Sequence, residues 1–228
     1  VVVDGVNSSG GIAIPKLLKA LGVKVVELYC EPTGHFPHNP EPLKEHLGAI
    51  CEKVVEEKAD FGIVVDPDVD RLAFITEKGE MFGEEYTLVA CADYVLSKTP
   101  GNTVSNLSST RALRDVTEKH GGSYTAAAVG EVNVVAAMKS QNAVIGGEGN
   151  GGIIYPESHY GRDALVGTAL FLMLLAEKDM PVSTLKESYP EYHMSKKKIQ
   201  LTPDLDVDGF IQSMANRYRE EPMTQVDG

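Results

Sequence analysis

The sequence predicts an α/β protein made of two tandem three-layer α/β/α domains with mixed, mostly parallel sheets. Short apolar segments rich in branched residues alternate with segments of helical period along residues 1–194. Two of the apolar segments, Phe61–Val65 and Ala143–Gly147, run into a loop with an acidic residue and return at once as another apolar segment. Because this strand–loop–strand pattern occurs once in each half, we expect two copies of one fold.

The first half, residues 1–82, contains the elements of one such fold. A buried strand over 1–4 leads through a glycine-rich turn to a helix over 12–21, with Pro15 in its first turn. A strand over 24–29 and an amphipathic helix over 42–58 follow. Strands over Phe61–Val65 and Leu72–Thr76 complete the half.

The second half, residues 83–194, repeats this plan. We expect helices over 84–96, 109–120 and 131–140, and strands over 103–107, 123–128, 143–147 and 153–155. Residues 195–228 differ in character, with a lysine run, a loop rich in Pro and Asp, and a helix over 207–220. This tail is expected to be the incomplete start of a further α+β domain.

The hexapeptide Asp66-Pro67-Asp68-Val69-Asp70-Arg71, here called the acidic loop, follows the strand Phe61–Val65. Alternate residues of an extended segment point the same way, so its three carboxylates can converge on one hard cation. Arg71 adds planar donors that suit a phosphate. The residues therefore predict a metal site, with Asp66, Asp68 and Asp70 as ligands, beside a phosphate site.

Other interpretations of the acidic loop remain open from the residues alone. In a calcium hand Glu77 would be the last ligand, but Arg71 stands where the sharp turn needs glycine, and both flanks resemble strands. In a haloacid-dehalogenase-like, Mg²⁺-dependent phosphatase, Asp66 would be the nucleophile and Asp68 the acid/base, although Asp70 replaces the Thr or Val of that pattern. A non-catalytic divalent-metal-binding module and a solvated acidic turn are the remaining alternatives.

A resemblance to a known family favours one interpretation. The acidic loop resembles the magnesium loop of the α-D-phosphohexomutase superfamily, the phosphoglucomutases, phosphomannomutases and phosphoglucosamine mutases. Gly147-Glu148-Gly149-Asn150-Gly151-Gly152, here called the glycine-rich loop, resembles the superfamily's sugar-recognition loop. Both motifs occur in the superfamily's order and at about its spacing. Ser108 stands where some members carry Lys, which is most similar to the phosphoglucosamine mutase branch.

The resemblance implies an incomplete enzyme. Residues 1–82 would be domain II, residues 83–194 domain III, and residues 195–228 the start of domain IV. The superfamily's phosphoserine and its main phosphate-clamping loop would then lie in missing N- and C-terminal domains of the same protein. His38-Asn39-Pro40 copies the end of the phosphoserine motif, but Pro37 occupies the place of the serine. We therefore expect the chain alone to be inactive.

The activity implied is transfer of a phosphoryl group between the 1- and 6-positions of a hexose or hexosamine phosphate, through an enzyme phosphoserine. The implied cofactor is Mg²⁺, held by the three aspartates of the acidic loop, with Arg71 stabilising the phosphoryl group. Glu148 and Asn150 would bind the sugar hydroxyls.

Two further residues are weaker candidates. Glu131 occupies the place where some members carry a His, and is interpreted either as an acid/base or orienting residue or as a helix-start carboxylate. Arg162 is interpreted either as a ligand of the substrate phosphate or as half of an Arg–Asp pair at a helix start.

The length and composition agree with a soluble cytoplasmic enzyme but do not identify it. The formal charge of −12 disfavours nucleic acid and anionic membranes as partners, whereas local donors and a divalent cation still permit a small anionic substrate. The three cysteines, an odd number in apolar segments, are expected to be free thiols of a reducing compartment. The longest apolar run, residues 164–176, is too short to cross a bilayer, and no signal peptide is visible.

Overall fold

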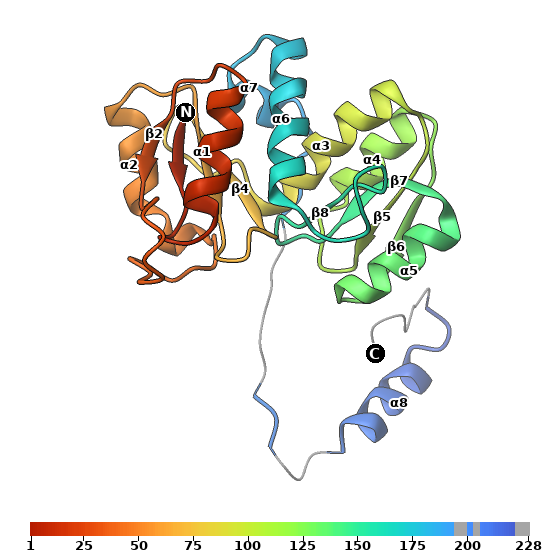
Figure 1. Cartoon of the computed structure of the whole chain (residues 1–228). Helices are drawn as coiled ribbons and strands as arrows, with labels where there is room; N and C mark the ends of the chain where they lie inside the picture. The colour runs from red at the N-terminus through yellow and green to blue at the C-terminus, as the bar shows by residue number, and fades with distance from the viewer. Residues whose placement is uncertain (194–199, 203–205, 222–228) are drawn as a thin grey trace. The chain divides into compact units, whose positions relative to one another are not determined.

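The computed structural model of the chain describes residues 1–193, 200–202 and 206–221 (Figure 1). Its contacts group Val1–Tyr192 into one compact unit and His193–Gly228 into another. In the second unit, helix α8 spans Val207–Arg217 and is capped by Asp206, whose side chain accepts the Gly209 N–H. Among the described residues, no helix is both long and apolar enough to span a membrane.

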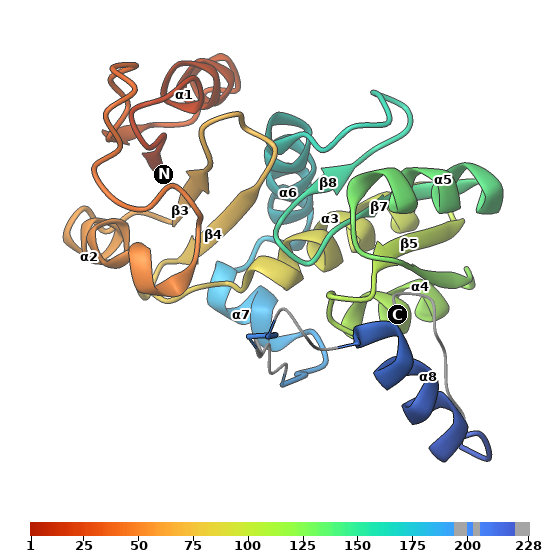
Figure 2. The same cartoon turned by 90° about the horizontal axis from the view of Figure 1, so that it is seen from below.

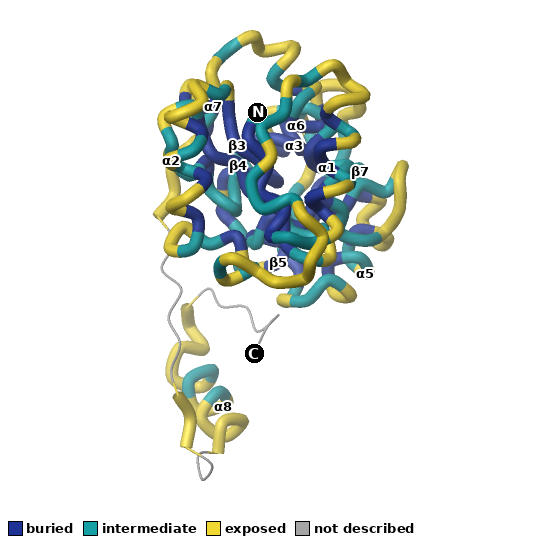
Figure 3. Tube along the Cα trace, turned by 60° about the vertical axis from the view of Figure 1, so that its left-hand side comes forward, coloured by how far each residue is buried: buried dark blue, intermediate teal, exposed yellow. Residues whose placement is uncertain are grey.

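The first sheet of the larger unit has the strand order β2-β1-β3-β4. Its strands are β1 (Val2–Asp4), β2 (Val26–Leu28), β3 (Phe61–Val65) and β4 (Leu72–Thr76). β1 pairs in parallel with β2 and β3, whereas β4 returns antiparallel to β3, with Val64 opposite Ala73. β3 and β4 are buried along their whole length, which explains their nearly continuous apolar sequences (Figure 3).

The second sheet has the equivalent order, β6-β5-β7-β8. Its strands are β5 (Asn102–Asn106), β6 (Tyr124–Ala127), β7 (Ala143–Gly147) and β8 (Ile153–Ile154). β5 pairs in parallel with β6 and β7, and β8 is antiparallel to β7. The prediction of two mixed, mostly parallel sheets flanked by helices is confirmed.

The predicted helices occur in the predicted order with local differences, and two further helices, over 164–178 and 182–187, were not predicted. The helical elements of the larger unit are α1 (Gly10–Ala20), the 3₁₀ turn η1 (Lys44–His46), α2 (Gly48–Glu56), α3 (Glu84–Lys98), α4 (Ala112–Lys119), α5 (Glu131–Gln141), α6 (Ala164–Lys178) and α7 (Val182–Glu187). The single helix predicted over 42–58 is wrong. Leu43 is extended, and Leu47 (φ −105°, ψ 19°) separates η1 from α2 just before Gly48, a poor helix former. Helix α1 starts at Gly10, so Pro15 lies beyond its first turn.

Helix α6 lies between the two sheets and joins their cores (Figures 1 and 2). Phe171 of α6 stacks on Phe74 of β4 with ring centroids 3.7 Å apart. A Cβ on Gly167 would lie 2.8 Å from Leu72 Cδ2 and 3.0 Å from Ile153 Cγ1, so only glycine lets α6 approach both sheets this closely. Apolar residues of both sheets therefore form one core. The boundary predicted near residue 82 lies between the two sheets in the sequence, although their apolar residues share this core.

Candidate functional site

The acidic loop connects β3 to β4 and is shaped by its first aspartate. Asp66 Oδ1 accepts the backbone N–H groups of Asp70 and Arg71, both at 3.0 Å. Val69 turns the chain in the left-handed conformation, at φ 62°. One oxygen from each of Asp66, Asp68 and Asp70 then lies within 4.8 Å of the others. These three carboxylates can hold a metal ion.

The electrostatics of the loop fit a divalent cation. The pKa of Asp66 is raised to about 7, first by burial and then by the neighbouring Asp70 and Asp68, against the opposing hydrogen bond from the Arg71 backbone. Asp68 is exposed, and Asp70 is half-buried. A cluster of carboxylate oxygens is the donor set that hard cations such as Mg²⁺ prefer, and such an ion would offset the repulsion within the loop.

Residues far from the loop in sequence support it. The hydroxyl groups of Ser8 and Ser9 both donate to the Pro67 carbonyl, at 2.9 and 2.8 Å. A Cβ on Gly10 would lie 2.3 Å from Val65 Cγ2, so the turn after β1 packs directly against the end of β3. The serine side chains therefore hold the backbone of the acidic loop.

Arg71 is held at the edge of the acidic loop by the proline-rich segment before α2. Its Nη1 donates to Glu41 Oε1 at 3.1 Å, and its Nε lies 3.7 Å from Asp66 Oδ2 and 3.9 Å from Asp70 Oδ1. That Nε is buried and has no hydrogen-bond acceptor among the described residues. The nearby His38 pairs with buried Asp4 at 3.0 Å, so the His38-Asn39-Pro40 motif has a structural contact here. Sequence reasoning missed Glu41.

The glycine-rich loop connects β7 to β8 and presents one buried carboxylate. Glu148 Oε1 accepts from Asn106 Nδ2 at 3.0 Å, and the Glu148 N–H donates to Gly152 O at 2.9 Å. Asn150 Oδ1 accepts the Gly152 N–H at 3.2 Å, so this side chain also braces its own loop. Asn106 was missed as a site residue, although its place at the carboxyl end of a parallel strand is a signal for one.

The acidic loop and the glycine-rich loop are in contact. The Leu72 N–H, directly after the acidic loop, donates to Gly151 O at 3.2 Å. Gly151 has φ +86°, and a Cβ there would lie 2.1 Å from Leu72 O. Glycine is required at this position both for the conformation and for the close approach.

Arg162 joins the predicted site residues of both halves. Its Nη2 donates to Asp70 Oδ2 in a very short contact, and its Nη1 donates to Glu148 Oε2 at 2.8 Å. Its Nε lies 3.3 Å from Glu131 Oε2, and its backbone N–H donates to Glu131 Oε1 at 3.3 Å. The structure thus places the candidates Asp70, Glu131 and Glu148 around one guanidinium group that is only 16% exposed.

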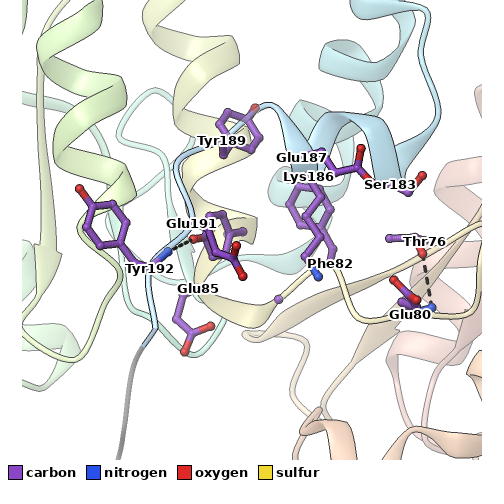
Figure 4. A pocket seen from close by; sticks show the side chains of 12 residues that line it. Thr76, Glu80, Phe82, Glu85, Ser183, Lys186, Glu187, Tyr189, Glu191 and Tyr192 are labelled. Carbon is purple, nitrogen blue, oxygen red and sulfur yellow. Dashed lines mark hydrogen bonds between the residues drawn. The ribbon is translucent and has the colours of Figure 1, made fainter.

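A pocket of about 460 Å³ lies elsewhere on the same unit (Figure 4). It is lined by residues from the end of β4, the start of α3, α7 and residues 189–192, including Thr76, Phe82 and Lys186. Lys186 Nζ donates to Met81 O at 2.6 Å, which ties α7 to the β4–α3 connection. The acidic loop enters β4 at Leu72, whereas the pocket reaches only Thr76, the last residue of β4. No residue that lines the pocket belongs to the acidic loop or to the glycine-rich loop, so the pocket and the carboxylate cluster are separate features.

The comparisons with known proteins agree with this arrangement. The family models described as "Phosphoglucomutase/phosphomannomutase, alpha/beta/alpha domain II" and "domain III" match residues 1–79 and 83–192. A phosphoglucomutase/phosphomannomutase of Thermococcus kodakarensis is 37% identical over 206 residues, 90% of this chain and 45% of the relative. A protein of Methanopyrus kandleri named "Probable phosphoglucosamine mutase" is 32% identical over 232 residues, 100% of this chain and 51% of the relative.

A crystal structure of a phosphoglucomutase/phosphomannomutase family protein from Burkholderia thailandensis has the same fold. It superposes with a TM-score of 0.75 at 30% identity and covers 83% of this chain and 42% of the other. The chain therefore spans about half the length of the relatives that it matches. Since both halves match their family models in order, the chain belongs to the phosphoglucomutase/phosphomannomutase family and contains its α/β/α domains II and III.

Proposed function

We propose that this chain is the central part of a phosphohexomutase that moves a phosphoryl group between the 1- and 6-positions of a hexose or hexosamine phosphate. The phosphoserine carrier and the remaining phosphate-binding loop would be supplied by further N- and C-terminal domains of the same cytoplasmic protein. The single observation that carries this proposal is the meeting of the acidic loop and the glycine-rich loop at Arg162. One ligand can therefore contact a metal site and a hydroxyl-binding site together.

We infer that Asp66, Asp68 and Asp70 bind Mg²⁺. When bound, this ion would offset negative charge and polarise the oxygens of the transferring group. Arg71 would bind the phosphoryl group beside it. The buried Nε of Arg71 supports this role, because it is an N–H donor without an acceptor among the described residues, and a phosphate oxygen is a suitable acceptor.

The sugar would bind at the glycine-rich loop. Glu148 already accepts one hydrogen bond on each carboxylate oxygen, from Asn106 and from Arg162, and each oxygen keeps lone pairs for a hydroxyl group. The Asn150 amide would contribute beside it. Glu131, at the first turn of α5, would act as the orienting or acid/base residue, and Arg162 as a substrate-binding residue.

Metal binding is tested by titrating the chain with Mg²⁺ in a calorimeter. Asp68→Asn should abolish binding, because it removes one charged ligand. Asp68 is exposed, so the substitution leaves the packing of the protein undisturbed. The control is Asp60→Asn, an exposed aspartate immediately before β3. Unchanged Mg²⁺ affinity of the Asp68→Asn variant would show that the metal binds elsewhere.

Turnover separates a mutase from a phosphatase. We expect the chain alone not to interconvert hexose 1- and 6-phosphates, because its phosphoryl carrier would lie outside it. A haloacid-dehalogenase-like phosphatase would instead use Asp66 as its nucleophile. Mg²⁺-dependent release of phosphate from a hexose phosphate, abolished by Asp66→Asn, would contradict the mutase proposal.

A further inference from the structure

Arg162 forms ion pairs with three carboxylates at this site. It contacts one carboxylate of the acidic loop, Asp70, one of the glycine-rich loop, Glu148, and one at the start of α5, Glu131. Asp70 is 92 residues distant from Arg162 in the sequence, so the contact joins the two sheets. The side chain is mostly buried, and therefore bulk water screens these charges little.

The charges around Arg71 and Arg162 do not balance. The ion pairs and the aspartates of the acidic loop bring together the guanidinium groups of Arg71 and Arg162 with a larger set of carboxylates: Glu41, Asp66, Asp68, Asp70, Glu131 and Glu148. Further positive charge is therefore favourable here. A cation bound by the acidic loop would be attracted by Asp70 and repelled by the guanidinium that already contacts Asp70.

We propose that Arg162 is an internal counter-ion, which holds the acidic loop and the glycine-rich loop together in the absence of metal and which a divalent cation displaces from Asp70. This inference rests on the proposed metal site. Displacement frees Nη2 of Arg162, while its Nη1 stays on Glu148. A hydrogen-bond donor therefore becomes available beside the glycine-rich loop once metal is bound. Arg162 is thus a positioning residue before it is a substrate ligand.

The counter-ion role predicts the direction in which Mg²⁺ affinity changes when Arg162 is replaced, which a purely structural role would not. Removing the guanidinium removes a competitor of the cation, so Arg162→Gln should bind Mg²⁺ several-fold more tightly than the wild-type chain in calorimetry. The same variant should melt at a lower temperature without metal, because the loops lose their common partner. By linkage, that deficit in melting temperature should shrink at saturating Mg²⁺.

Two further variants separate charge from shape and from general effects. Arg162→Lys keeps the charge but lacks the fork that reaches both loops, so it should lower the metal-free melting temperature and leave Mg²⁺ affinity unchanged. It also tests the proposal if Arg162→Gln does not fold. Arg114→Gln is the matched control, because Arg114 lies on α4 and its ion pairs are with Asp115 and Glu118 of the same helix. It should change neither quantity.

The outcomes distinguish this inference from the function on which it rests. Weaker Mg²⁺ binding by Arg162→Gln would overturn the inference alone, because it would mean that Arg162 prepares the site for the metal. An unaltered metal-free melting temperature of both Arg162 variants would also overturn it. If the wild-type chain binds no Mg²⁺ at all, both the metal site and the counter-ion role fail.

Discussion

The acidic loop and the glycine-rich loop occupy the same position in two sheets of the same topology, yet they are stabilised differently. The acidic loop closes a hairpin with five paired positions, β3 with β4, whereas the glycine-rich loop closes one with two, β7 with β8. The acidic loop is held by hydrogen bonds from Ser8, Ser9 and its own backbone. The glycine-rich loop is held by close backbone contacts that side chains would prevent.

This difference follows from the charge that each loop carries. Three carboxylates in one turn repel each other, so their loop needs a firm hairpin and external donors. A loop with one carboxylate has no such repulsion, and its glycines let it lie directly on the strand of the other sheet. The same position in the fold therefore carries three clustered carboxylates in one half of the unit and a single buried carboxylate in the other.

The largest predicted effect tests whether the two sheets behave as one folding unit. Phe171→Ala removes the ring that stacks on Phe74 and contacts Phe61 and Phe82 edge-on, and should lower the free energy of unfolding by about 3–5 kcal/mol. Because the core is shared, urea unfolding followed by tyrosine fluorescence and by circular dichroism should show one coincident transition. The control Met173→Ala, an exposed position of α6, should cost under about 1 kcal/mol. Two separate transitions, with only one shifted, would mean that the sheets fold independently.

A loss of stability of intermediate size is expected when the contact between the two loops is disturbed. Gly151→Ala and Gly121→Ala both place a side chain at positive φ, +86° and +78°, which costs about 1–2 kcal/mol. Only Gly151 also faces a backbone atom, Leu72 O, whereas nothing lies near a Cβ on Gly121. Thermal melts should therefore show a clearly larger loss of stability for Gly151→Ala. Equal losses would indicate that the loops do not need their close approach.

The smallest effect compares the cysteines of the two halves. Burial raises the pKa of Cys30 to about 11, and it raises the pKa of fully buried Cys91 further still. Since the thiolate is the reactive form, alkylation of Cys30 by iodoacetamide should be slow at pH 8 and rise about tenfold at pH 9. Mass spectrometry should find Cys91 unmodified until the chain is unfolded. Fast labelling of native Cys91 would show that the second half opens readily.

The sequence alone determined the local features of this protein. The strands Phe61–Val65, Leu72–Thr76 and Ala143–Gly147 were predicted with their observed bounds, because a buried strand needs a short run of branched apolar residues. The two loops were recognised because their chemistry lies in consecutive residues. The prediction of one helix over 42–58 was wrong, because the helical period of the apolar residues does not show that the chain turns at Leu47.

The contacts that assemble the candidate site were decided only by the tertiary structure. Arg162 faces Asp70 and Glu148, Arg71 faces Glu41, and Asn106 faces Glu148, each across many residues of sequence. Sequence periodicity does not predict such pairs, because the partner of a side chain depends on which carboxylates the packed sheets bring within its reach. The packing that brings them within reach depends on α6 and Gly167, where the absence of a side chain lets two sheets share one core.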